Sequence, residues 1–184
     1  MHKLHAAIVF GAFIAAIAHG APAAEPYTIT TILPLTGPAA FLGNGERHAL
    51  ELMEKQVNAT GGIQGRPLRL KFEDDQSRPQ IGVQLSNVAI ADKPAVLIGS
   101  SLVATCRAMA PLMQNGPVQY CLSPGIHPEK GYVFTGNTST IDDIDALIRF
   151  FRLEGWTRIA ILVSSDATGQ DAEHGIRGVM AMPE

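Results

Sequence analysis

The chain of 184 residues has little cysteine, few aromatic residues and little charge. Its two cysteines, Cys106 and Cys121, are too few for a disulfide-dense scaffold or for a zinc site with four ligands. Charged residues make up 17% of the chain, the formal net charge is −3, and Lys and Arg form no cluster. Because binding to phosphates requires clustered cations, this composition argues against nucleic acid as a partner.

Motifs of common nucleotide-binding and hydrolytic enzymes are also missing. Gly45 is not followed by the lysine that a P-loop requires, and the chain has neither the G-x-S-x-G elbow nor the H-E-x-x-H pair. Asp74 and Asp75 are adjacent at the end of a predicted strand, where neighbouring side chains point to opposite faces, so capping and solvent contact are favoured over a catalytic or metal-binding pair. We therefore expect no enzyme activity, no metal and no cofactor.

The first 23 residues have the parts of a secretory signal peptide. Lys3 gives the positive start, residues 6–18 form an apolar run, and Ala21-Pro22-Ala23 or its neighbour offers small residues for cleavage. A buried helix or a membrane anchor is the alternative, but the run is shorter than the roughly 20 residues that cross a bilayer. No cysteine near the cleavage point offers a lipid attachment site. We expect a mature protein free in the periplasm, with 13 Lys and Arg against 17 Asp and Glu and a formal charge of −4.

Strand-like and helix-like segments alternate in the next hundred residues. Strands are predicted at residues 27–35, 68–72, 95–98 and 118–122, and helices at 45–59, 79–91 and 102–113, the last interrupted by Pro111. In the first helix, the apolar residues Ala49, Leu52, Met53 and Val57 share one face. This alternation implies an α/β fold, a parallel sheet with helices on both faces that binds ligands at the carboxyl ends of its strands.

The character of the chain changes after residue 122. Residues 123–139 pack turn formers around a strand-like piece at 132–135, a stretch too long for an ordinary strand-helix loop, which indicates a cleft loop and a crossover into a second lobe. A helix is expected from about 141 to 154 with Thr140 as its cap. A buried strand at 158–163 and the beginning of another helix, in residues 164–175, follow.

The two cysteines fall at the same end of the predicted sheet. Cys106 lies in the first turn of one helix and Cys121 near the end of the next strand, so we expect them to approach each other. A disulfide in an oxidising compartment and a pair of small buried residues are equally compatible with the sequence.

Five segments together resemble a known family: LPLTGPAAFLG, NATGGIQGRPLRLKFEDDQSRP, AVLIGS, LSPGIHPEKGYVF and WTRIAILVSSDATGQD. In this order and at this spacing they are similar to the leucine/isoleucine/valine-type periplasmic binding proteins, the solute receptors of ABC importers. The resemblance covers most of residues 27–171. It implies the type I periplasmic binding protein fold, in which two α/β lobes close on one small solute. Residues 24–122 would be the first part of lobe one, and residues 140–184 the truncated start of lobe two.

The resemblance implies a receptor that delivers a small carboxylate-bearing solute to the membrane permease of an ABC importer. Branched-chain or other amino acids, and related organic acids or amides, are the expected solutes. A ligand-sensing input domain of a receptor or regulator is the alternative, because relatives of this fold serve in that role.

The resemblance also implies the position of the first cleft wall. Leu42 would line the cleft, whereas Phe41 fits a place in the wall and a place under the helix equally. After the third strand, Ser100 or Ser101 would cap a helix whose free N–H groups suit a solute carboxylate. The usual ligand-binding serine of the family is replaced here by Leu102 or Val103, so a hydroxyl contact would come from Ser101 or Thr105, or be absent.

The second wall and the far lobe complete the expected site. The family grips the α-carboxylate and α-ammonium of an amino acid with the second wall, which here comprises Ser123, Gly125, Ile126 and His127 and is one residue shorter. His127 would bind an acidic or aromatic-acid solute, or lie in an ordinary surface turn. Thr168 takes the place of an aromatic residue of the relatives, which widens the pocket or makes it more polar.

Overall fold

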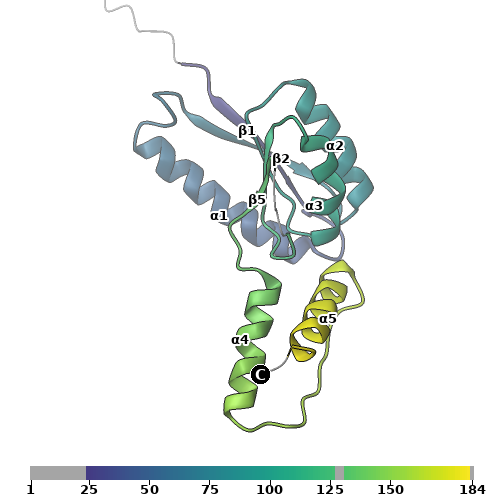
Figure 1. The fold of residues 1–184 in the computed structure, drawn as a ribbon. Helices are drawn as coiled ribbons and strands as arrows, with labels where there is room; N and C mark the ends of the chain where they lie inside the picture. The colour runs from purple at the N-terminus through teal and green to yellow at the C-terminus, as the bar shows by residue number, and fades with distance from the viewer. Residues whose placement is uncertain (1–23, 127–130, 183–184) are drawn as a thin grey trace, which may run out of the picture.

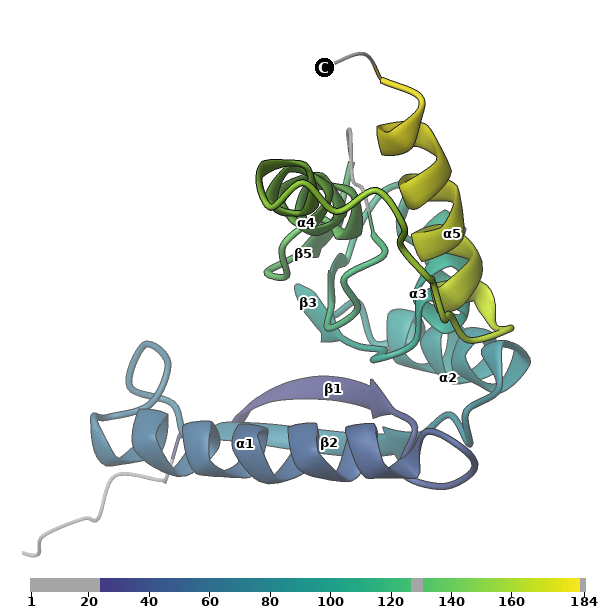
Figure 2. The ribbon, with the colours of Figure 1, turned by 90° about the horizontal axis from the view of Figure 1, so that it is seen from below.

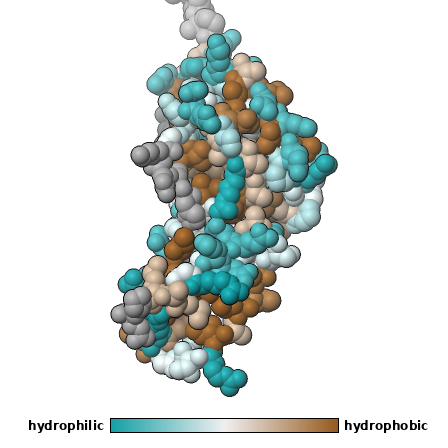
Figure 3. All heavy atoms as spheres, turned by 45° about the vertical axis from the view of Figure 1, so that its right-hand side comes forward, coloured by the Kyte–Doolittle hydropathy of each residue, from teal (hydrophilic) through white to brown (hydrophobic). Residues whose placement is uncertain are grey.

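The structure, a computed structural model, describes residues 24–126 and 131–182, which form two parts (Figure 1). The sheet part comprises residues 24–126 and 131–136, and the helical part comprises residues 139–182. The outline of the molecule narrows between the two parts, and hydrophobic and hydrophilic surface alternate on both (Figure 3). The predicted signal peptide, residues 1–23, lies outside the described residues.

The five strands of the sheet part are rich in apolar and β-branched residues and all run parallel. β1 (Tyr27–Leu33) pairs with β2 (Leu68–Asp74) on one side and with β3 (Val96–Ile98) on the other. β4 (Val118–Cys121) and β5 (Val133–Thr135) extend the sheet, so the order is β2-β1-β3-β4-β5. The predicted parallel α/β sheet is confirmed, and the strand-like piece at 132–135 joins this same sheet.

Helices cover both faces of the sheet (Figure 2). α1 (Ala40–Ala59) runs along β1 and β2 on one face, while α2 (Pro79–Ala91) and α3 (Val103–Met109) lie on the other. A short 3-10 helix, Ala110–Met113, continues α3 where Pro111 prevents a regular α-helix. The main core lies between the sheet and the helices α2 and α3, and it contains Ile32, Ala89, Leu97, Met109 and Met113.

The face of α1 that packs on the sheet is not the predicted apolar face. Leu52 and Met53 are 65% and 57% exposed, whereas Glu54 and Asn58 face β2. The Asn58 side chain accepts from the Leu68 N–H at 2.6 Å and donates to the Leu68 carbonyl at 2.9 Å, and Glu54 accepts from the Leu70 N–H at 2.9 Å. Because β2 is an edge strand, its free backbone groups need polar partners, and this need turns the polar side of α1 inward.

Two helices form the helical part, α4 (Thr140–Leu153) and α5 (Ala167–Met180), and they pack through Ile144, Ile148 and Val179. Both agree with the predicted positions. The cap of α4 is Ser139 and not Thr140, because the Ser139 hydroxyl accepts from the Ile141 N–H at 3.2 Å. No helix of the described chain is long and apolar enough to cross a membrane.

The strand predicted at residues 158–163 does not form. This segment is extended without a strand partner among the described residues, and Leu162 is 99% exposed. An apolar run becomes a strand only where a neighbouring strand takes its backbone hydrogen bonds. The prediction was therefore wrong for the described chain.

The two cysteines form a disulfide. Cys106 in α3 and Cys121 at the end of β4 are both fully buried, and their Cα atoms lie 6.2 Å apart. The bridge joins α3 to the end of β4. The expected approach of the two residues is confirmed, and of the two alternatives the sequence left open, the structure has the disulfide.

Candidate functional site

A cavity of about 610 Å³ lies between the carboxyl ends of the strands and the start of α5. Its walls come from the segments that follow β1, β2, β3 and β4, together with residues 164–168 of the helical part. The lining residues are Pro38, Ala39, Phe41, Leu42, Glu46, Ser77, Pro79, Ser101, Leu102, Val103, Ala104, Leu122, Pro124, Ser164, Asp166, Ala167 and Thr168. Ligands of parallel α/β sheets bind in this position, outside the carboxyl ends of the strands.

Asp74 fixes the loop after β1 at the mouth of this cavity. Its carboxylate accepts hydrogen bonds from the Leu35 N–H at 2.9 Å, the Thr36 N–H at 3.1 Å and the Thr36 hydroxyl at 2.6 Å. Partial burial alone would raise the pKa of Asp74, but these bonds and one from the Gln76 N–H outweigh it and lower the pKa. The adjacent Asp75 comes directly after β2 and is fully buried, so the expected solvent contact was wrong for this residue.

The segment after β3 turns its two serines in opposite directions. Ser100 is buried and donates to Asp75 at 2.6 Å, whereas the Ser101 hydroxyl lines the cavity and donates to Glu46 of α1. Leu102 is the N-cap residue of α3, and no side chain caps this helix. The predicted cap at Ser100 or Ser101 was therefore wrong: α3 begins only at Val103, and the Ser100 hydroxyl oxygen accepts from the Leu102 N–H at 3.3 Å, before the helix starts.

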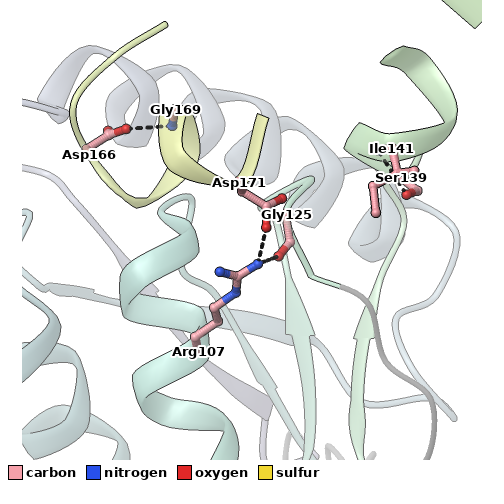
Figure 4. Close-up of polar contacts among 7 residues, drawn as sticks. All are labelled: Arg107, Gly125, Ser139, Ile141, Asp166, Gly169 and Asp171. Carbon is pink, nitrogen blue, oxygen red and sulfur yellow. Dashed lines mark hydrogen bonds and ion pairs between the residues drawn. The ribbon is translucent and has the colours of Figure 1, made fainter. Parts of the chain in front are cut away.

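The charge of the cavity is set by Glu46 and Asp166, the charged residues among the described lining. Burial raises the pKa of the Glu46 carboxyl, the hydrogen bond from Ser101 opposes this, and the charge of Asp75 adds to the increase. Hydrogen bonds from the Ser164 hydroxyl and the Gly169 N–H lower the pKa of Asp166, which caps α5 (Figure 4).

Arg107 connects the two parts of the molecule beside the cavity (Figure 4). Its Nη2 donates to the Gly125 carbonyl at 2.9 Å and to Asp171 Oδ1 of α5 at 2.5 Å. Gly125 fits here because it has no side chain: a Cβ would lie 2.6 Å from Val103 Cγ2 and 3.2 Å from Asp171 Oδ2. One cation thus holds the second wall and the helical part together.

The family model described as periplasmic binding protein matches residues 26–181 of the chain. The chain belongs to the periplasmic binding protein family.

A curated member of this family, the Leu/Ile/Val-binding protein homolog 3 of Brucella melitensis, is 34% identical over 135 residues, which are 73% of this chain and 33% of the relative. The chain therefore spans about a third of the length of this curated relative.

Solved periplasmic binding proteins share the fold. An ABC transporter substrate-binding protein from Desulfitobacterium hafniense in complex with Leu superposes with a TM-score of 0.70, 24% identity and coverage of 84% of this chain and 47% of that one. A solute-binding protein of an ABC transporter from Rhodopseudomonas palustris, in complex with 3,4-dihydroxybenzoic acid, superposes with a TM-score of 0.70 and 20% identity. The match covers 85% of this chain and 44% of that one. The type I periplasmic binding protein fold is thus confirmed.

The predicted site residues of this periplasmic binding protein separate into two sets. Those that line the cavity are Phe41, Leu42, Ser101, Leu102, Val103 and Thr168. Those that the structure places outside the lining are Ser100, Thr105, Ser123, Gly125 and Ile126. Thr105 and Ser123 are fully buried, and their hydroxyls make no hydrogen bond within the described part of the chain. His127 lies outside the described residues.

Sequence reasoning missed Glu46, Ser77, Ser164 and Asp166 of the lining. Glu46 comes four residues after Leu42, so both lie on one helical face. The predicted helix began only at Gly45, and this start separated them. Across residues 24–126 and 131–182, no group of three or more His, Cys, Asp and Glu side chains is placed to hold a metal ion.

Proposed function

We propose that this chain is part of a periplasmic receptor that binds a small solute and delivers it to the permease of an ABC importer. The cavity between the strand ends and α5 is the observation that carries this proposal. Its mixed apolar and hydroxyl lining suits binding of a small molecule rather than chemical conversion. The relative's name, and the Leu and dihydroxybenzoate in the two solved structures, support an amino acid or a small organic acid as the solute.

The solute would be enclosed when the two lobes close on it. We assign residues 24–122 to the first part of lobe one, 123–139 to the cleft loop and crossover, and 140–184 to the start of lobe two. Closure would bring residues 164–168 over the solute and exclude water from it. The contact from Arg107 to Asp171 supports this assignment, because it joins the two sides of the cavity.

A periplasmic location agrees with two features of the chain. Residues 1–23 have the composition of a cleavable signal peptide. The Cys106–Cys121 disulfide is favoured in an oxidising compartment such as the periplasm.

A thermal-shift screen of the full-length protein against amino acids, amides, ureas and aromatic acids tests the binding function. A true solute at 100 times its Kd stabilises the folded state by about 2.7 kcal/mol. Uptake of that solute should fall when the gene is deleted. A screen in which no solute stabilises the protein would contradict the proposal, and unchanged uptake would point to a sensing role instead.

A further inference from the structure

Asp75 is a fully buried carboxylate beside the cavity that is not one of its lining residues. Burial raises the pKa of its carboxyl, the hydrogen bonds it accepts oppose this, and the charge of Asp74 adds to the increase. Its hydrogen-bond partners in the described chain are neutral groups, so no cation offsets the cost of burying the charge. Such exceptions to the usual composition of protein interiors are concentrated at functional sites.

The two oxygens of Asp75 join the segment after β2 to the wall after β3, residues 100–104. Oδ1 accepts from the Ser77 N–H at 2.8 Å, and Oδ2 accepts from the Ser100 hydroxyl at 2.6 Å. Ser100 is fully buried, and its hydroxyl oxygen accepts from the Leu102 N–H at 3.3 Å. These bonds fix the backbone that presents Ser101 and Leu102 to the cavity, as hydrogen bonds behind a binding site usually do.

The neighbours of Asp75 hold the wall after β1. Asp74 accepts from the Thr36 N–H at 3.1 Å. The Ser77 hydroxyl donates to the Thr36 carbonyl at 2.9 Å and accepts from the Ala39 N–H at 3.1 Å. One short stretch of chain therefore connects three walls of the cavity, and Asp75 is the member that reaches the wall after β3.

We propose that Asp75 is a positioning residue of the solute site: acting through Ser100, it sets the wall after β3 in its binding conformation before the solute arrives. Its buried charge lowers the stability of the protein but raises the affinity, because a wall that is already ordered loses less entropy on binding. This inference rests on the proposed function, and it assigns to that site a residue outside its lining.

Amide hydrogen exchange of the full-length protein without solute tests whether Asp75 holds this wall. The reporter is the Leu122 N–H, which donates to the Ser100 carbonyl at 3.2 Å in a bond that neither of two variants removes directly. Its exchange should become about tenfold faster in Asp75→Asn and in Ser100→Ala, while the amides of β1 keep their rates. Unchanged exchange of Leu122 in both variants would overturn the inference.

Urea unfolding at pH 7 separates positioning from a merely structural role. A carboxyl whose pKa is raised by folding destabilises the protein at pH values where it is ionised. The urea midpoint of Asp75→Asn should therefore equal or exceed that of the wild type. A lower midpoint together with faster exchange throughout the sheet would show a merely structural role and overturn the inference.

Calorimetric titration with leucine and with 3,4-dihydroxybenzoate measures the effect on binding. For a probe that binds the wild type, Asp75→Asn and Ser100→Ala should each weaken binding by about tenfold. The double variant should bind no more weakly than either single variant, because Asp75 acts through Ser100. Additive losses, or wild-type affinity in Asp75→Asn, would overturn the inference.

Ser86→Ala is the matched control for these variants. Ser86 in α2 is as buried as Ser100, but its hydroxyl makes no hydrogen bond within the described part of the chain and does not line the cavity. This variant should keep the wild-type affinity and the wild-type exchange of Leu122. If neither probe binds the wild type, the proposed solute class fails, while the exchange of Leu122 still decides the role of Asp75.

Discussion

The sheet part and the helical part are stabilised in different ways although both contain apolar, strand-like and helical sequence. In the sheet part, five strands pair, a core of buried side chains lies beneath them, and a disulfide joins α3 to β4. In the helical part, two helices share a small core, and residues 157–164 extend along them without a strand partner among the described residues. The comparison shows that an apolar segment adds stability only where the fold supplies a surface that buries it.

Two leucine substitutions give the largest expected contrast between the parts. Leu97→Ala in β3 should destabilise the protein by about 2–5 kcal/mol, because Leu97 is fully buried in the core. Leu162→Ala in the exposed segment should change the stability by less than about 0.5 kcal/mol. Urea unfolding followed by circular dichroism measures both. A similar loss in the two variants would mean that residues 157–164 are buried after all.

Removal of the disulfide tests whether the sheet part depends on the covalent link. The bridge spans 15 residues, so the Cys106→Ala/Cys121→Ala variant should lose about 3 kcal/mol of unfolding free energy. The reduced wild-type protein should unfold at the same urea concentration as this variant, and reductant should have no further effect on the variant. A wild-type midpoint that reductant does not shift would contradict the prediction.

Gly125 lies where the two parts meet. An alanine at this position should lower the free energy of unfolding by less than removal of the disulfide does. Gly125→Ala would place a Cβ 2.6 Å from Val103 Cγ2, and the required shift should destabilise the protein by about 1–3 kcal/mol. The matched control is Gly45→Ala in α1, where a Cβ has open space and should stabilise the helix by up to about 1 kcal/mol. Differential scanning calorimetry compares the two variants. An unchanged stability of the Gly125→Ala variant would show that the close approach of Val103 does not constrain this position.

The ion pair of Arg107 should have the smallest effect on stability and a specific effect on motion. Its side chain is 47% exposed, so Arg107→Ala should cost at most about 1 kcal/mol. Amide hydrogen exchange should become faster in α5 but stay unchanged in β1 and β3, because only the contact between the parts is lost. Arg177→Ala, which breaks the pair with Glu173 inside α5, is the control and should leave the contact between the parts intact. Unchanged exchange in α5 of the Arg107 variant would show that the ion pair does not restrain the helical part.

The sequence predicts those features that depend on neighbouring residues. The helix at 79–91 and the strands at 68–72 and 118–122 were found because apolar spacing and Gly or Pro stops are local signals. The strand at 158–163 failed because a strand also needs a partner, which no local pattern shows.

The same limit applies to the site. The resemblance to the family implied that Leu42 lines the cleft and that Ser101 offers a hydroxyl there, and it left Phe41 open; all three residues line the cavity. The hydrogen bond of Glu46 comes from Ser101, which lies 55 residues further along the chain, so only the folded structure brings the two together.

The polar side of α1 also has a consequence for the behaviour of the protein at high concentration. Asn58 and Glu54 occupy backbone groups of β2 that would otherwise be free to recruit a strand from another molecule. The opposite edge, β5, offers only three residues for such recruitment. Aggregation by strand addition should therefore begin at the exposed apolar segment near Leu162 rather than at β2, and a lysine at position 162 should delay it without affecting the cavity.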